Sequence, residues 1–310
     1  MMSIGQFDVK PANAGFVAKC SEALRRGLSR PPSSSATHPT LSTNHNLEEN
    51  PVKIVVCMKE TPSTTVEKSF GPDMRIERRK EDAVINPFDE YTIEEGLRQQ
   101  EKHAGSEVIA LCMGPATATD NIRRALAMGA DRGVLVTDPA LAGSDAIGTA
   151  RVLAAALKQI GFDLALFGSA AADAYGGVVP SAVAEFLGMP LLSFAGKLDI
   201  DGSTARIERQ AEVGYQVAEA SMPALVSVVK SINEPRYPSM KGIMQAKKKP
   251  IDTLTLANLG LDADTVGAAG AREEALSAEK VTAQRKGEIY MGNEGAADRI
   301  VAFLVEQKVL

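Results

Sequence analysis

The chain has 310 residues, of which 45% are hydrophobic and 24% are charged. This length and hydrophobic content are enough to bury the core of one large domain or of two small domains. Its net charge of -5 argues against a general nucleic-acid surface, because phosphate-binding surfaces are usually strongly basic. No apolar run reaches the roughly 18–20 residues that span a bilayer, so stable membrane insertion is not predicted. The three cysteines form no CxxC pair, so their spacing predicts neither a metal site nor a disulfide framework.

Residues 1–51 differ in composition and in hydrophobic pattern from the rest of the chain. The stretch 30–40 is rich in Pro, Ser and Thr without apolar periodicity, which predicts disorder. One interpretation is a nonfunctional tail or a mis-assigned start, because the folded pattern begins abruptly at Val52. The alternative is a mitochondrial presequence, since Arg25, Arg26 and Arg30 accompany hydroxyl residues, although acidic residues interrupt the pattern.

From residue 52 onward, short apolar runs alternate with segments of helical periodicity. The runs predict buried strands over 54–58, 108–113, 133–136 and 163–167. The periodic segments predict helices over 89–103, 119–128, 144–160 and 178–187. Such alternation with short connections predicts an α/β fold with a doubly wound, mainly parallel sheet, here expected over residues 52–255.

After Pro190 the pattern changes. Short strands are predicted over 197–200, 205–208 and 225–229, with a turn at Asp201 and Gly202. Beyond them an Ala/Gly/Glu-rich stretch leads to a final helix near 296–307. We expect residues 256–310 to form an arm that packs on another chain.

Two loops at predicted strand ends carry residues suited to binding, because ligands of open parallel sheets lie outside the carboxyl ends of the strands. The first ends in Asn86, Pro87, Phe88 and Asp89, where the polar side chains either bind a ligand or cap the next helix. The second begins at Met113, where the following glycine either permits close approach of a ligand or makes an ordinary turn.

The third loop, 168–179, reads GSAAADAYGGVV and leads into a helix. Helix N-termini bind phosphate, and glycines let the phosphate approach the backbone N–H groups. Neither GxGxxG nor GxxxxGK[ST] is present, so the loop favours an anion or nucleotide site without matching a common fingerprint.

Conventional catalytic arrangements are missing. His38 and His45 lie in the predicted tail, His103 lies near a helix end, and no nucleophile elbow or HExxH occurs. Pyrophosphatases with a similar sheet need a Ser/Gly-rich phosphate loop after the first strand, where this chain has KETP at 59–62. The sequence therefore favours binding over bond-making catalysis.

Five stretches together resemble one family. They are NPFDE at 86–90, ALAMGAD at 125–131, the loop 168–179, NEPRYPSMKGIM at 233–244 and AKKKP at 246–250. In this order they are similar to the β subunits of electron transfer flavoproteins, most of all to bacterial members of the housekeeping, AMP-binding type. The resemblance runs from about residue 52 to 262, and the segment with NEPRY and AKKKP is its most specific part.

The resemblance implies a heterodimer with an α subunit that holds most of a redox-active FAD. The pair would accept electrons from flavin dehydrogenases, such as acyl-CoA dehydrogenases of fatty acid oxidation, and pass them to a membrane quinone reductase. The β subunit would bind AMP and make no bonds of its own. A bacterial member would be cytoplasmic; the alternative is the mitochondrial matrix if the tail is a presequence.

By position, the resemblance also implies site residues. AMP contacts would fall at Cys57, Asn86, Pro87, Phe88, Asp89, Met113, Gly168, Ala171, Asp173, Gly176, Gly177, Val178 and Val179. Phe88 would also lie near the partner's flavin. An exposed loop from about Tyr237 to Ala246 would dock into dehydrogenases through Tyr237, Met240, Lys241, Ile243 and Met244.

In that loop Met240 would be the apolar anchor, while Lys241 and the lysines at 247–249 steer encounter. The alternative for the lysine run is a solvated helix face. Two departures weaken the family pattern: Gln210 stands where an acid usually follows arginine, and Thr64 stands where some members carry an aromatic residue.

Two other readings stay open. In a flavin-bifurcating relative, a second FAD would replace AMP, and the small residues of the third loop leave room for it. A universal-stress-type nucleotide-binding protein acting alone would have the same kind of parallel sheet. This interpretation does not explain NEPRY or the segment after Pro190.

Overall fold

The computed structural model describes residues 51–278, 292 and 294–309. The predicted tail, except for Pro51, lies outside the described residues. Within the described ranges, no helix is long and apolar enough to cross a membrane.

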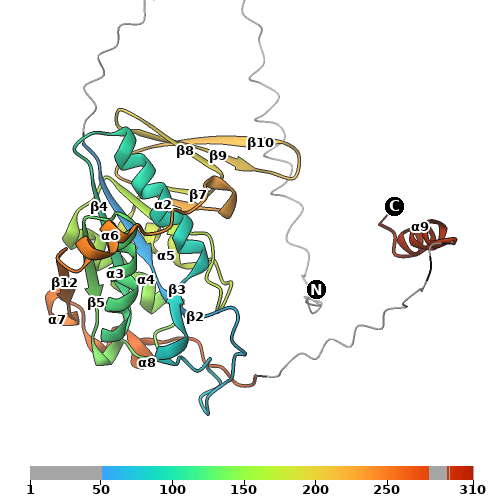
Figure 1. Ribbon diagram of the computed structural model, residues 1–310. Coiled ribbons are helices and arrows are strands. Elements are labelled where there is room, and N and C mark those ends of the chain that lie inside the picture. The colour runs from blue at the N-terminus through green and yellow to red at the C-terminus, as the bar shows by residue number, and fades with distance from the viewer. Residues whose placement is uncertain (1–50, 279–291, 293, 310) are drawn as a thin grey trace, which may run out of the picture. The chain divides into compact units, whose positions relative to one another are not determined.

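A seven-stranded parallel sheet forms the centre of the fold (Figure 1), in the order β12-β5-β4-β1-β6-β11-β7. The central strand is β1 (Lys53–Met58). On one side lie β4 (Glu107–Met113), β5 (Arg132–Val136) and β12 (Ile251–Leu254). On the other side lie β6 (Leu164–Gly168), β11 (Ala224–Val228) and β7 (Leu191–Ala195). The chain thus winds outward from β1 in both directions.

Helices cover both faces of this sheet. The pleat of β1 directs Ile54, Val56 and Met58 into one core, with α2 (Pro87–Lys102) and α3 (Thr119–Met128). Val55 and Cys57 point to the opposite core, with α4 (Ala146–Ile160) and α5 (Val179–Leu187). Because the central strand is buried on both faces, it reads as a continuous apolar run.

Two small antiparallel sheets flank the main one. One contains β8 (Lys197–Asp201), β9 (Thr204–Gln210) and β10 (Tyr215–Ser221). The other pairs β2 (Glu60–Pro62) with β3 (Ala83–Ile85). The predicted turn at Asp201 and Gly202 joins β8 to β9, and Gly202 takes a φ of 56° there, a conformation that glycine adopts without strain.

Short helices complete the described chain. They are α6 (Met240–Ala246), α7 (Leu256–Leu259), α8 (Gly267–Gly270) and α9 (Ala296–Glu306). Single 3-10 turns lie at Lys80–Asp82, Ala116–Ala118, Pro139–Leu141, Lys230–Ile232 and Ala263–Thr265.

The predicted doubly wound α/β fold is confirmed, and the eight predicted strands and helices of its core lie within two residues of their expected bounds. One expectation is wrong: residues 240–246 form helix α6 instead of a loop, because they pack against α3. The strands β2, β3, β7, β10 and β12 were not predicted.

Candidate functional site

Three loops meet where β1, β4 and β6 end. These strands are neighbours in the sheet and run parallel, so their carboxyl ends share one edge. The chain goes from β1 to β4 on one side and later returns to β6 on the other, so the winding reverses beside β1. Such a reversal opens a crevice that binds ligands in other open sheets.

Asn86 ties the first loop to the third. It is the N-cap residue of α2, but its side chain makes no capping hydrogen bond. Its Nδ2 instead donates to the carbonyl of Ala170 at 2.9 Å, and its Oδ1 accepts from the N–H of Ala172 at 3.0 Å. The helix-cap interpretation of Asn86 is therefore wrong, and the residue ties the loop after β6 to the start of α2.

Asp89 is buried beneath the same loops, at 5% exposure. Its Oδ2 accepts from the N–H of Lys59 at 2.8 Å. Burial raises the pKa of this carboxyl to about 7, although the bond from Lys59 opposes the shift. A Cβ at Gly168 would lie 2.4 Å from Oδ1 of Asp89, so only glycine fits there.

Cys57 and Met113 mark the ends of the neighbouring strands. The thiol of Cys57 is buried in the core against α4 and α5, and this burial raises its pKa well above the ordinary value. The side chain of Cys57 thus faces the core and does not reach the strand end. Met113 is half-buried, and Gly114 follows it.

A charged cluster borders the third loop. Lys59 Nζ donates to the two carboxylate oxygens of Asp173 at 3.1 and 2.9 Å, and Arg78 pairs with the same carboxylate. Burial would raise the pKa of Asp173, but the two cations outweigh it and hold the pKa below the usual value. Lys68 adds a third cation that donates to the carbonyl of Ala172 at 3.3 Å.

The rest of the third loop is open. Ala171 accepts from the N–H of Tyr175 at 2.7 Å, which closes a turn before Gly176. Gly177 takes a φ of 62°, and Val178 and Val179 then begin α5, whose first N–H groups have no partner within the helix. Small side chains and free N–H groups make this loop suited to an anionic ligand.

Phe88, in the first turn of α2, belongs to a small aromatic group beside the third loop. Its ring meets Tyr175 edge-on, with centroids 5.9 Å apart, and Nζ of Lys230 lies 4.4 Å from its centroid. Tyr175 is 65% exposed, with a φ of 54°. The group therefore presents an aromatic face and a cation at the surface.

The sequence did not single out Lys59, Lys68, Arg78 or Lys230. Lys59 alone had a usable signal, because it directly follows β1. The others come from distant segments that only the fold brings together. Among the residues that the structure describes, no group of three or more His, Cys, Asp or Glu side chains is placed to hold a metal ion.

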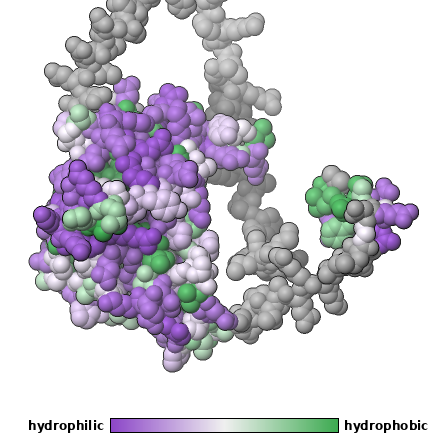
Figure 2. Space-filling model, in the orientation of Figure 1, coloured by the Kyte–Doolittle hydropathy of each residue, from purple (hydrophilic) through white to green (hydrophobic). Residues whose placement is uncertain are grey.

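The predicted docking residues lie on and before α6. Tyr237, Met240 and Met244 are 94%, 77% and 69% exposed, and Ile243 is 44% exposed. Lys241 is also exposed. Figure 2 shows apolar surface over α6 with hydrophilic surface around it.

The lysine run divides between two roles. Nζ of Lys249 donates to the carbonyls of Leu126, Gly129 and Ala130 at 3.2, 2.9 and 2.6 Å, so it caps the C-terminus of α3. Its burial lowers its pKa. Lys247 and Lys248 are exposed, so they alone of the three match a solvated, steering role.

The departures from the family pattern lie at the surface. Gln210 is exposed at the end of β9, and Thr64 is exposed after β2. Beside Gln210, Arg209 bonds to Gln216 at 3.0 Å and to Ser193 at 3.2 Å, both uncharged.

Comparison with known proteins identifies the family of the chain. The family described as "Electron transfer flavoprotein domain" matches residues 73–259. An electron transfer flavoprotein subunit beta of Mycobacterium bovis is 40% identical over 263 residues, covering 83% of this chain and 99% of the relative. One from Thermoanaerobacterium thermosaccharolyticum is 35% identical, covering 78% and 93%. The Caffeyl-CoA reductase-Etf complex subunit CarD of Acetobacterium woodii is 33% identical, covering 84% and 100%. The chain therefore belongs to the electron transfer flavoproteins, as a β subunit.

Proposed function

We propose that this chain pairs with an FAD-bearing α subunit, accepts electrons from flavin dehydrogenases such as acyl-CoA dehydrogenases, and delivers them to the respiratory chain through a quinone reductase. Family membership over most of the chain supports this role. The chain performs no bond-making reaction of its own and works in the cytoplasm of a bacterial cell.

AMP is the ligand proposed for the crevice at the ends of β1, β4 and β6. The observation that carries this proposal is Asn86, which holds the third loop across the crevice from the first. Lys59 and Arg78 supply positive charge for a phosphate, and Gly176 and Gly177 give it access to backbone N–H groups. Phe88, Val178 and Tyr175 offer apolar surface for a base.

FAD, held mainly by the α subunit, supplies the electron storage when bound. Phe88 is the residue proposed to face it, with Lys230 behind the ring. Helix α9 supports only the C-terminal part of the arm proposed for residues 256–310, because Ile300, Val301 and Phe303 are all more than half exposed. Leu256 and Val266, in contrast, are buried in the core of this chain. Apolar side chains left exposed in this way are typical of a surface that another chain covers.

Coexpression with a cognate α subunit tests the proposal directly. We expect a yellow heterodimer that releases one FAD and one AMP on denaturation, identified by absorption spectrum and chromatography. A stable, colourless monomer that never recruits a flavin-bearing chain would overturn it.

The similarity to a subunit of a caffeyl-CoA reductase complex favours one second candidate, a bifurcating type with FAD in place of AMP. Small residues in the third loop, such as Ala171 and Gly176, leave space for a larger ligand. Two FAD molecules and no AMP per heterodimer would establish this alternative.

Docking through α6 predicts a kinetic effect of Met240→Ala. This side chain is 77% exposed, and burial of a whole side chain of this size contributes about 1.5–3 kcal/mol. We expect the KM for the heterodimer, measured with an acyl-CoA dehydrogenase and its substrate, to rise about tenfold or more. FAD and AMP content should not change.

Ile147→Ala is the matched control, since Ile147 is an exposed apolar residue of α4. It should leave the same KM unchanged. Unaltered kinetics of Met240→Ala with several dehydrogenases would contradict docking through this residue.

A further inference from the structure

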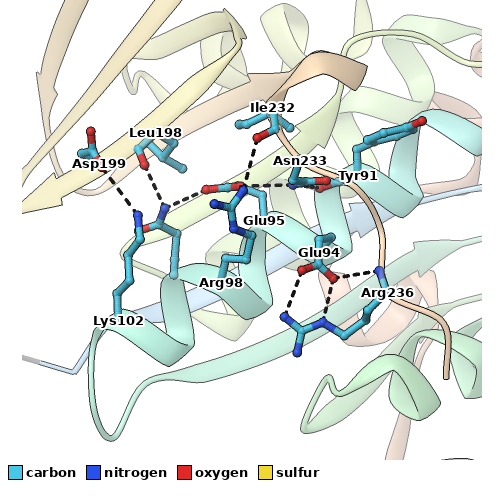
Figure 3. Close-up of polar contacts among 11 residues, drawn as sticks. Tyr91, Glu94, Glu95, Arg98, Lys102, Leu198, Asp199, Ile232, Asn233 and Arg236 are labelled. Carbon is cyan, nitrogen blue, oxygen red and sulfur yellow. Dashed lines mark hydrogen bonds and ion pairs between the residues drawn. The ribbon is translucent and has the colours of Figure 1, made fainter. Parts of the chain in front are cut away.

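Helix α2 holds the segment that leads into α6. Figure 3 shows its acidic and amide side chains pointing toward residues 232–236 and toward β8. Asn233 donates to the carbonyl of Tyr91 at 3.0 Å and to Oε2 of Glu95 at 3.1 Å. Arg98 donates to the carbonyl of Ile232 at 3.2 Å. The start of the segment is therefore bonded to one face of α2.

Glu94 makes the largest number of these contacts with a single residue. Its side chain is 7% exposed and accepts from three groups of one residue, Arg236. The backbone N–H lies at 3.1 Å, Nε at 2.7 Å and Nη2 at 2.9 Å. The remaining Nη1 donates to Glu101 at 2.6 Å. A fork-to-carboxylate pair fixes orientation as well as distance, because both planar groups must align.

This arrangement fixes backbone as well as side chain. The N–H of Arg236 is bonded to the same carboxylate as its guanidinium, so the chain direction at residue 236 is set by Glu94. Tyr237 follows immediately, and α6 begins at Met240. A buried charge of this kind needs its partner, since an unpaired buried carboxylate is costly.

The far end of α6 is held independently. Arg123 of α3 donates to the carbonyls of Ala246 and Lys249, while Lys249 caps α3 in return. Between the two ends, Gly242 lies so close to α3 that a Cβ would meet the carbonyl of Ala127 at 2.4 Å. The exposed side chains of residues 237–244 thus project from a backbone fixed at both ends.

We propose that Glu94, acting through Arg236, is a positioning residue for partner docking: it holds residues 237–244 in the orientation in which they meet the electron donor. This inference rests on the proposed docking function. Orienting the segment before encounter removes part of the entropy that binding would otherwise lose. Loss of Glu94 therefore weakens docking without removing any group that touches the donor.

Glu94→Gln in the complete heterodimer tests the inference, because glutamine keeps one acceptor oxygen and leaves no buried charge. Amide hydrogen exchange, followed by mass spectrometry, should speed up at residues 233–246 and stay unchanged in β1 and β4. With an acyl-CoA dehydrogenase as donor, the KM should rise about tenfold while kcat changes less than twofold. Glu94→Asp, which keeps the charge, should restore part of the affinity.

A double-mutant cycle separates positioning from general damage. If Glu94 acts through the segment, Met240→Ala should raise the KM less in the Glu94→Gln background than alone. Glu107→Gln is the matched control, since Glu107 of β4 also pairs with an arginine, Arg132 of β5, at 2.8 Å. This variant should change neither the hydrogen exchange at residues 233–246 nor the KM. If Glu94→Gln does not assemble, Arg236→Lys keeps the charge but loses the fork, and the same increases in exchange and KM are expected.

The outcomes distinguish the two claims. A raised KM for Met240→Ala, with exchange and KM unchanged for Glu94→Gln, would overturn the role of Glu94 alone. Faster exchange in Glu94→Gln, with no change of KM in either variant, would overturn docking through this segment and the positioning role with it. Strictly additive effects in the cycle would also overturn positioning.

Discussion

Asn86 and Asp89 lie one helical turn apart at the start of α2 and hold neighbouring strand ends together. Asn86 bonds to the loop after β6, whereas Asp89 accepts the N–H of Lys59 after β1 and a backbone hydrogen bond from Gly168 at the end of β6. The sequence allowed a prediction that both are important, because polar residues before a helix at a strand end are typical of a crevice. Their bonds could not be predicted, since the partners of Asn86 come from about 84 residues further along the chain.

Asp89 predicts an unusual dependence of stability on pH. Its pKa is about 7 in the folded protein against 3.8 ordinarily, so between these values the folded state keeps a proton that the unfolded state has lost. The stabilisation that comes from this retained proton is therefore fully present below about pH 4, and it is lost as the pH rises through about 7. Relative to Asp89→Asn, the free energy of unfolding of the wild type should fall by up to about 1.4 kcal/mol per pH unit between about pH 4 and about pH 7.

Urea unfolding of both heterodimers from pH 5 to pH 8 measures this difference. Asp163→Asn is the control, because exposed Asp163 accepts the same kind of bond from the N–H of Lys53 at 2.8 Å. This control removes the same kind of hydrogen bond at an exposed carboxylate. A constant difference between Asp89→Asn and the wild type would contradict a protonated Asp89.

Helix α6 shows how packing decides an element that the sequence leaves open. Residues 240–246 contain Gly242 and follow Pro238, a composition typical of a loop. Ser239 caps the helix by accepting from the N–H of Gly242 at 3.0 Å, and α3 supplies the packing surface. A cap signal was present in the sequence, but the packing that stabilises a single short helix was not.

Gly242→Ala tests that packing. The new Cβ would meet the backbone carbonyl of Ala127 at 2.4 Å, and backbone cannot rotate away as a side chain does. We expect a loss of about 1–3 kcal/mol in the free energy of unfolding, and faster hydrogen exchange in α6. Gln245→Ala, an exposed change on the same helix, should alter neither, and equal effects of the two variants would contradict close packing at Gly242.

Three of the missed strands, β7, β10 and β12, lie at the edges of sheets. β7 and β12 are the outermost strands of the main sheet, so each pairs on one side only, and their sequences LLSFA and IDTL are short. β10 is an edge strand with mostly exposed side chains, which gives no apolar run. The central strands were predictable because burial on both faces makes them continuously apolar.

At the scale of the whole molecule, AMP should stabilise the fold. A ligand that binds only the folded state adds about 2.7 kcal/mol at one hundred times its dissociation constant. After removal of endogenous nucleotide, added AMP should raise the midpoint of thermal unfolding of the wild-type heterodimer. Adenosine should raise it less, because it lacks the phosphate proposed to meet Lys59 and Arg78.

Asn86→Ala should abolish the rise in the unfolding midpoint that AMP causes, because the loop after β6 loses both hydrogen bonds from the Asn86 side chain. Asn121→Ala is the control: Asn121 is a buried asparagine that bonds to Glu60 at 2.8 Å, so its loss should lower the midpoint yet preserve the rise with AMP. An undiminished AMP shift in Asn86→Ala would argue against the crevice as the site.

Under the proposed docking role, the fixed backbone of residues 237–246 has a consequence for the range of donors that one carrier serves. A surface whose main chain is held at both ends cannot reshape itself for each donor. Adaptation must then come from side-chain rotamers, and the exposed tips of α6 are Met240 and Met244, two unbranched thioethers. Promiscuity in this protein would therefore reside in methionine torsions rather than in a flexible loop.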